Sequence, residues 1–250
     1  MGGDRVPPLL MTAPQGQEWS RIHDREASWR EKIVGEISGI FIIPRYVEFF
    51  YDKFGRDSGA TFFEIGSGNG DVTRAVLAAN RGQIGRYTVS EYFPEGVEWL
   101  RQQGFEAVQA DACRLPLPDA SHDVSVEFDV MHHVDDPRAM AREMMRTGRG
   151  RCLLTESNGL SVFRKLKELT PGHRAAGEKS FTPRRWRGFF EGHPGYTLTR
   201  FEIFPFLFPF KVPAALLPLL LWWNRTVERI PVIRWQCSSV AIYLEYRRDP

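Results

Sequence analysis

The sequence predicts an open, doubly wound α/β sheet of seven strands. Short apolar segments alternate with helical segments between residues 60 and 160, and the connections between them are short. A run with three glycines stands between the first apolar segment and the helix after it. The 250-residue chain is 42% hydrophobic and has 18 phenylalanines and 7 tryptophans, which is enough for one large core.

The N-terminal part precedes the first strand. Residues 1–16 are predicted to be a disordered leader, and they lack the basic and apolar runs of a signal peptide. Residues 17–58 have apolar side chains at three- and four-residue steps, which predicts helices, the second of them starting at Pro44. We expect these helices to flank the sheet and cover its ligand-binding edge. Residues 17–250 are predicted to form a single domain.

The central region contains five predicted strands, each a short run rich in apolar and β-branched residues. They are 61–65, 86–91, 105–110, 123–128 and 151–157. Helices are predicted between them at 72–79, 94–103 and 137–147. Such alternation with short connections indicates parallel strands covered by helices on both faces.

The last hundred residues contain a predicted helix at 183–190 and strands at 196–204 and 238–246. Between these two strands lies an apolar insertion, residues 203–231. Four prolines and Lys211 interrupt it, so we reject a transmembrane helix. Three interpretations remain open: a cap over a substrate pocket, a membrane contact through 203–225, or a dimer interface.

The sharpest motif is EIGSGNG, which spans residues 64–70 between a predicted strand and a predicted helix. Gly66, Gly68 and Gly70 allow a tight turn and a close approach of the backbone to a ligand. A dinucleotide-binding fingerprint needs glycine at the sixth position, where this chain has Asp71, which would oppose a pyrophosphate. Glu64 precedes the first glycine and suits a ligand with positive charge. The motif therefore favours a sulfonium-bearing nucleotide over a dinucleotide.

Two further acidic residues lie at the carboxyl ends of predicted strands. Glu91 ends the second strand, about 20 residues past the glycines, where a carboxylate can accept both ribose hydroxyls. Asp111 ends the third strand and could accept a hydrogen bond from an adenine amine. In a doubly wound sheet the carboxyl ends of the parallel strands meet at one edge. We therefore expect the acids at 64, 91 and 111 to lie around one site.

These motifs together resemble those of the class I S-adenosylmethionine-dependent methyltransferases, in particular the small-molecule, lipid and quinone branch. The matching segments are EIGSGNG (64–70), VSE (89–91), DACRLPLPDASHD (111–123) and VMHHVDDP (130–137), and they cover roughly residues 60–160. The resemblance implies a Rossmann-like sheet whose last strand is antiparallel, with S-adenosylmethionine as cofactor. It implies cofactor-binding roles for Glu64, Gly66, Gly68, Gly70, Glu91, Tyr92, Asp111, Ala112 and Phe128.

Candidate catalytic residues lie in the segment VEFDVMHHVDD. Glu127 would be costly near the end of a buried strand unless a ligand or a partner uses it. His132 and His133 follow in the loop and could accept a proton from a hydroxyl, an enol or an ammonium group. A packing role for either histidine remains the alternative. The two aspartates before Pro137 are interpreted as helix-start residues.

The predicted function is S-adenosylmethionine-dependent methyl transfer to a hydrophobic or lipid-linked small molecule. The alternatives are a catalytically silent cofactor-binding adaptor and, third, a nicotinamide-dependent oxidoreductase. The net charge of +2 gives no case for nucleic acid as a partner, and three dispersed cysteines argue against a structural zinc site. We expect a cytoplasmic protein, with a peripheral contact at the inner face of a membrane as one option.

Overall fold

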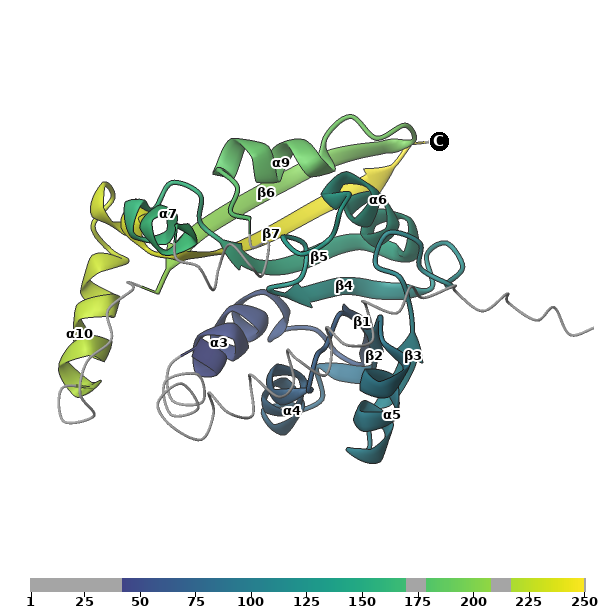
Figure 1. Ribbon diagram of the computed structural model, residues 1–250. Coiled ribbons are helices and arrows are strands. Elements are labelled where there is room, and N and C mark those ends of the chain that lie inside the picture. The colour runs from purple at the N-terminus through teal and green to yellow at the C-terminus, as the bar shows by residue number, and fades with distance from the viewer. Residues whose placement is uncertain (1–41, 170–178, 208–216, 250) are drawn as a thin grey trace, which may run out of the picture.

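The computed structural model describes residues 42–169, 179–207 and 217–249. Its seven strands form one sheet in the order β3-β2-β1-β4-β5-β7-β6 (Figure 1). The strands are β1 (Ala60–Ile65), β2 (Ile84–Glu91), β3 (Glu106–Gln109), β4 (His122–Phe128), β5 (Gly148–Ser157), β6 (Tyr196–Phe206) and β7 (Ser239–Arg248). The predicted leader, the helical region 17–41 and residues 208–216 of the insertion lie outside the described residues.

Strand directions match the prediction of a doubly wound sheet. β1 pairs in parallel with both β2 and β4, so that Glu64 stands opposite Val89 on one side and Val126 on the other. The last strand, β7, runs antiparallel to both of its neighbours, β5 and β6. The strand order reverses between β1 and β4, and the crevice at such a switch point is where α/β sheets bind ligands.

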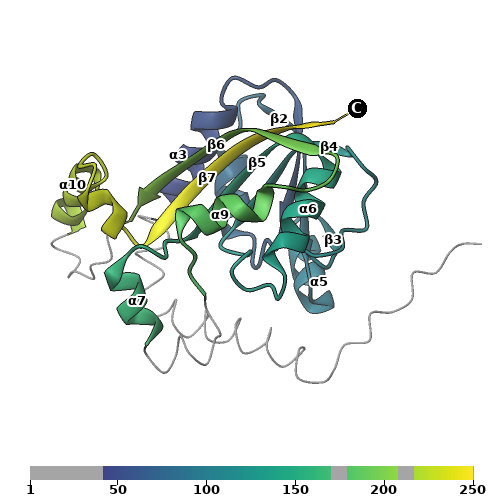
Figure 2. The ribbon, with the colours of Figure 1, turned by 90° about the horizontal axis from the view of Figure 1, so that it is seen from above.

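Helices cover both faces of the sheet (Figures 1 and 2). One face carries α3 (Ile43–Phe54), α4 (Asp71–Ala78) and α5 (Pro94–Gln102), and the other carries α6 (Pro137–Thr147) and α9 (Pro183–Phe190). Successive strand residues point to opposite faces. Phe62 therefore packs in the core beneath α3, whereas Phe63 packs in the core beneath α6. This two-sided burial explains why two consecutive residues of β1, Phe62 and Phe63, are both large and apolar.

The prediction for the N-terminal flank needs a correction at α3. Phe50 and Phe54 are fully buried and pack against Phe62 of β1, so α3 lies on the face of the sheet. It does not cover the ligand-binding edge along its length. Only its first turns approach that edge, where Tyr46 meets Phe128 at the end of β4.

The C-terminal region also differs from the prediction. β6 extends to Phe206, so the apolar insertion begins after that residue and not at 203. β6 is an edge strand, where Pro205 removes no ladder hydrogen bond that the sheet needs. Three elements were not predicted: α7 (Val162–Glu168), α10 (Leu217–Val227) and the short η3 (Ile233–Gln236). Among the described residues no helix is both long and apolar enough to cross a membrane.

Candidate active site

The glycine loop connects β1 to α4 at the carboxyl edge of the sheet. Its glycines all have positive φ, and Gly66 and Gly68 illustrate two different requirements. A Cβ on Gly66 would lie 2.8 Å from both methyl carbons of Val130, in the loop after β4, whereas a Cβ on Gly68 would meet nothing within 4 Å. Gly66 thus lets two loops touch, and Gly68 faces open space. Gly70 caps the N-terminus of α4 in the left-handed conformation.

Glu64 is buried directly beneath this loop, with 2% of its surface exposed. Its carboxylate accepts hydrogen bonds from the hydroxyls of Tyr87 (2.7 Å), Thr73 (2.8 Å) and Ser67 (3.0 Å). Burial raises the pKa of Glu64 against the lowering effect of these three donors. The side chain therefore ties β1 to the loop, to the first turn of α4 and to Tyr87 of β2.

Glu91 ends β2 beside the glycine loop. The Gly68 N–H donates to Glu91 Oε2 at 3.0 Å, and the Tyr92 N–H donates to Oε1 at 2.8 Å. Both oxygens are therefore oriented by backbone groups, and a carboxylate can accept up to about four hydrogen bonds. The structure brings together the predicted ribose acid and the predicted glycine loop, which are 23 residues apart in the sequence.

Asp111 and Ala112 follow β3 on the same edge. Asp111 Oδ1 accepts a hydrogen bond from the Cys113 N–H at 2.8 Å, which closes a tight turn. The Ala110 N–H donates to the Glu91 carbonyl at 3.0 Å, so this turn is fixed against the end of β2. Because β3, β2 and β1 are neighbours in the sheet, the three predicted acids occupy three adjacent strand ends.

On the other side of the switch point, Phe128 ends β4 and stacks on Tyr46 with ring centroids 5.5 Å apart. Asp129 follows with φ of 60°, a left-handed conformation that aspartate tolerates better than most residues. The Tyr46 hydroxyl donates a short hydrogen bond to Asp129 Oδ2. Removal from water raises the pKa of Asp129 to about 6, although His132 and Tyr46 lower it. A carboxyl group near its titration point thus stands at the end of β4.

Glu127 lies in β4, two residues before Asp129, and is fully buried. Its Oε2 accepts a hydrogen bond from the Val130 N–H at 2.7 Å, whereas its Oε1 has no hydrogen-bond partner. Burial and the nearby Glu156 carboxylate raise the pKa of Glu127 well above its usual range. A protonated Glu127 can donate a hydrogen bond but cannot accept a proton.

The two predicted histidines occupy different environments. His132 is buried, and its Nδ1–H donates to Glu156 Oε2 at 2.7 Å, while its backbone N–H donates to Glu156 Oε1 at 3.2 Å. Burial alone would lower the pKa of His132, but Glu156 and Asp129 outweigh it and raise the pKa above the usual value. His133 is exposed, with its ring 4.0 Å from that of His132.

Sequence reasoning missed three residues of this half: Tyr46, Asp129 and Glu156. Tyr46 lies in α3 and Glu156 at the end of β5, so no local spacing connects them with the segment 127–133. An acidic residue at the end of a buried strand was the available signal for Glu156, the same signal that singled out Glu127. By contrast, the prediction for the helix start is confirmed, since Asp136 Oδ1 accepts the N–H groups of Arg138 and Ala139 at the start of α6.

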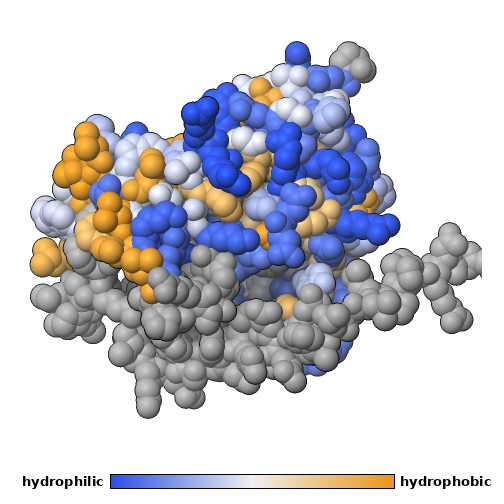
Figure 3. Space-filling model, turned by 45° about the horizontal axis from the view of Figure 1, so that its top comes forward, coloured by the Kyte–Doolittle hydropathy of each residue, from blue (hydrophilic) through white to orange (hydrophobic). Residues whose placement is uncertain are grey.

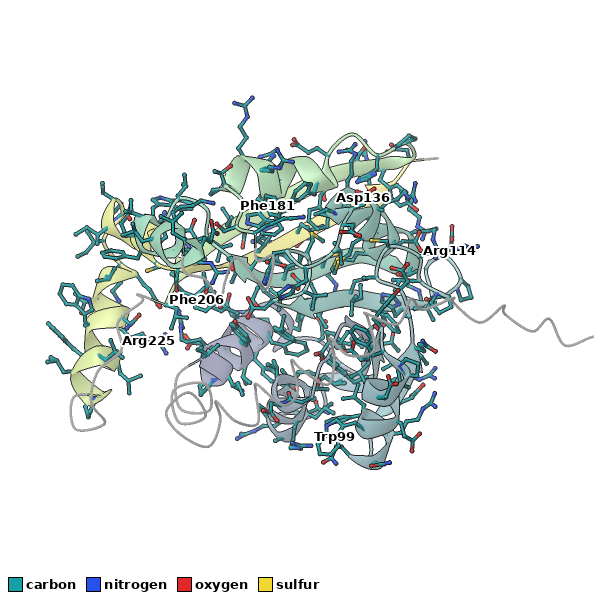
Figure 4. All side chains as sticks on the ribbon, in the orientation of Figure 1. Trp99, Arg114, Asp136, Phe181, Phe206 and Arg225 are labelled. Atoms are coloured by element: carbon teal, nitrogen blue, oxygen red, sulfur yellow. The ribbon has the colours of Figure 1, made fainter. Side chains whose placement is uncertain are left out.

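Ion pairs join α3 to the region of α10. Arg45 Nη2 lies 2.6 Å from Glu228 Oε2, and both side chains are buried. Arg225 points from α10 toward α3 and pairs with Glu48, with Nη2 2.6 Å from Oε2 (Figure 4). Phe206, at the end of β6, packs edge-on against Tyr46 with centroids 5.9 Å apart. The described end of the insertion is thus attached to the helix that provides Tyr46.

Comparisons with known proteins bear on the same region. A family model described as a methyltransferase domain matches residues 63–153. A Mycobacterium tuberculosis protein named as a probable S-adenosylmethionine-dependent methyltransferase is 48% identical over 86 residues, which cover 34% of this chain and 28% of the relative. The ubiquinone/menaquinone biosynthesis C-methyltransferase of Hahella chejuensis is 31% identical over 134 residues, covering 50% of this chain and 53% of the relative. The matches thus span about a quarter to a half of these relatives.

The fold extends the likeness beyond the matched segment. The crystal structure of an S-adenosylmethionine-dependent methyltransferase from Thermotoga maritima superposes with a TM-score of 0.64 over 91% of this chain and 97% of that chain, at 14% identity. Such low identity shows a common fold and no more. The family match over residues 63–153 and the matched relatives show that this segment is similar to S-adenosylmethionine-dependent methyltransferases, and the described residues share their fold with a solved methyltransferase.

Proposed function

We propose that this chain binds S-adenosylmethionine and transfers its methyl group to a hydrophobic or lipid-linked small molecule. The observation that supports this most is the contact between Glu91 and the Gly68 N–H, at the strand order reversal of the sheet. It sets an oriented carboxylate beside an open glycine loop, with Asp111 at the next strand end.

The residues present fit this cofactor. Gly68 leaves open space where a side chain would stand, so a ligand can approach the backbone there. Glu91 would hold the ribose hydroxyls, and Asp111 with Ala112 would hold the adenine. Tyr92 and Phe128 would pack against the adenine and the methionine portion. Glu64 would act from below, through the loop that it fixes by three hydroxyl groups.

When bound, the cofactor supplies a methyl group on a sulfonium, which an aligned nucleophile displaces in line. The chain's own residues orient the acceptor and take a proton where the acceptor retains one. Asp129 suits this second task, because its pKa of about 6 leaves it mainly ionised at neutral pH and Tyr46 fixes its position. Of the residues proposed from sequence, Glu127 would donate a hydrogen bond, and His132 or His133 would serve as alternative bases.

An apolar acceptor is supported by the aromatic groups on this side of the site. Tyr46 contacts both Phe128 and Phe206, and Phe49 packs against Phe206 with centroids 4.8 Å apart. The Hahella relative is named for methylation in quinone biosynthesis. We also propose peripheral membrane contact through the part of the predicted segment 203–225 that follows β6, which would give a lipid-linked acceptor access to the site.

Calorimetric titration with S-adenosylhomocysteine tests the cofactor assignment. We expect the wild type to bind and Glu91→Ala to lose about 1.5–3 kcal/mol, or roughly ten- to hundredfold in affinity. Glu95→Ala is the matched control, because Glu95 is an exposed carboxylate on the helix that follows and should leave affinity unchanged. Failure of folded wild type to bind would refute the assignment, and binding of NAD in its place would favour an oxidoreductase.

The acceptor class is tested separately with methyl-labelled S-adenosylmethionine and a lipid extract. Label is expected in the organic phase with wild type and is expected to fall strongly with Glu91→Ala. Label found only in water-soluble products would overturn the apolar acceptor while leaving methyl transfer intact. Cofactor binding without transfer to any extract would favour the silent adaptor.

A further inference from the structure

The described part of the chain concentrates its exposed apolar side chains at one end of the molecule. Eleven large hydrophobic residues are exposed in the described part of the chain, and all of them belong to two segments, residues 160–169 and 219–233. They are Leu160, Val162, Phe163, Leu166, Leu169, Leu219, Trp222, Trp223, Ile230, Val232 and Ile233. We call them the apolar end surface; they account for the apolar atoms gathered at the left of Figure 3.

The two segments form one surface although about 50 residues separate them in the sequence. The Ser161 hydroxyl donates to the Gln236 carbonyl at 2.8 Å, and Asn158 Nδ2 donates to the Trp235 carbonyl at 2.9 Å. These bonds attach the start of α7 to η3, which follows α10 after a short connection. α7 and α10 lie at the same end in both views of the ribbon (Figures 1 and 2).

α10 itself is apolar on both of its sides. Leu220, Asn224 and Val227 are buried and follow one another at four- and three-residue steps. The Asn224 side-chain amide donates a hydrogen bond to the Leu220 carbonyl. The opposite side carries Leu219 and Trp222, which are 57% and 61% exposed. A helix surrounded by water should be polar on its outer face, so this outer face indicates a partner that is itself apolar.

Charge identifies the kind of partner. The segments 160–169 and 217–236 contain six basic residues and two acidic ones. The acids are Glu168 and Glu228, with side chains 17% and 5% exposed. Among the basic residues, Arg229 is exposed, Lys165 is exposed and pairs with Glu168, and Arg225 is exposed and pairs with Glu48 of α3. A second copy of the chain in a two-fold contact would bring these basic residues against themselves. An anionic phospholipid surface would accept both the tryptophans and the cations.

We propose that the apolar end surface docks on a membrane that contains anionic phospholipid. The inference rests on the proposed function and deepens it. Because Arg45–Glu228 and Arg225–Glu48 tie this end to α3, the membrane would lie beside the helix that bears Tyr46. A lipid-linked acceptor would then reach the end of β4 from the bilayer. The sequence predicted a membrane contact through the apolar insertion alone, and the structure adds α7 to the same surface.

Vesicle flotation tests the proposal with the full-length chain. We expect wild type to float with phosphatidylcholine vesicles that contain about one third phosphatidylglycerol, and to float several-fold less with phosphatidylcholine alone. Leu166→Glu in α7 and Trp222→Glu in α10 should each lower flotation about tenfold, because each puts a charge into the apolar contact. Gln103→Glu, after α5 at the far end of the molecule, is the control that adds the same charge without effect.

Titration with S-adenosylhomocysteine on the same samples separates this proposal from the proposed function. Retained cofactor binding in both surface variants would show that they are folded. Wild type that binds cofactor but does not float would overturn the membrane surface alone. Flotation equal in wild type and both variants would also overturn it, as would a dimer that both variants disrupt without any flotation. Flotation without cofactor binding would instead refute the cofactor assignment and leave the surface standing.

Discussion

The carboxyl edge of the sheet has two halves. We call the ends of β1, β2 and β3 the cofactor half and the ends of β4 and β5 the acceptor half, after the roles proposed for them above. Each half buries a glutamate, and the two glutamates lie on adjacent strands. Glu64 of β1, in the cofactor half, accepts hydrogen bonds from three hydroxyl groups. Glu127 of β4, in the acceptor half, accepts one bond from the Val130 N–H and leaves its other oxygen without a partner. Glu127 stands opposite Ile65, so the two carboxyl groups point to opposite faces of the sheet.

This difference shows how the two halves are built. In the cofactor half, groups within ten residues of Glu64, with Tyr87 from the next strand, satisfy the buried carboxylate. In the acceptor half, Asp129, Glu127 and Glu156 lie close together, and their partners come from α3 and the loop after β4. The first half is a closed structural unit. The second keeps polar groups whose hydrogen bonds are incomplete, as expected where a ligand completes them.

The largest contrast should come from replacing the two glutamates by leucine. Glu64→Leu leaves the buried hydroxyls of Tyr87 and Thr73, and the half-buried hydroxyl of Ser67, without this acceptor. We therefore expect it to lower the free energy of unfolding by about 3–4 kcal/mol at pH 7. Glu127→Leu removes a carboxyl group that already lacks one partner and should change that free energy by less than about 1 kcal/mol. Urea denaturation measures both, and equal losses would refute the proposed difference between the halves.

The second contrast concerns the glycine loop. Gly66→Ala adds a left-handed alanine whose Cβ would lie 2.8 Å from the Val130 methyls, so we expect a loss of about 3 kcal/mol. Gly68→Ala has the backbone strain without the contact and should lose about 1 kcal/mol. Adding Val130→Ala to Gly66→Ala should recover part of the loss. Thermal denaturation that ranks the two single variants equally would show that the two loops do not touch.

The smallest contrast concerns pH and Asp129. The pKa of Asp129 is raised in the folded protein to about 6, so its stabilising contribution is fully present below its unfolded value, about 3.9, and is lost as pH rises through 6. Asp129→Asn keeps an acceptor for the Tyr46 hydroxyl and removes this titration. It should therefore be more stable than wild type by about 1 kcal/mol at pH near 8. This value is smaller than the pKa shift alone would give, because Asp129 is partly exposed and water screens its charge.

Unfolding measured across pH checks this prediction. The difference between Asp129→Asn and wild type should shrink as pH falls and disappear at pH below about 3, where the carboxyl group is protonated in both folded and unfolded chains. Tyr46→Phe is the companion variant, since it removes the donor that favours the ionised form. A constant difference at all pH values would mean that Asp129 does not titrate near 6.

Most of the fold was predictable because its signals are local. Apolar runs of strand length, Pro137 after a capping aspartate and the helix at 183–190 each reflect neighbours in sequence, and the structure has these elements within a few residues of the predicted bounds. The insertion was harder. Its start was misplaced because Phe204 and Phe206 suit an apolar insertion as well as an edge strand, and only pairing with β7 separates the two.

The sequence by itself determined the doubly wound sheet, the resemblance to methyltransferases and the positions of the glycine loop and its three acids, because backbone freedom and strand ends depend on residues close together in the chain. Only the tertiary structure decided which residues meet in the acceptor half. Tyr46 reaches Asp129 from 83 residues away, Glu156 reaches His132 from the next strand, and α7 joins α10 in one surface. Such contacts depend on how distant helices and strand ends pack, which no local pattern specifies.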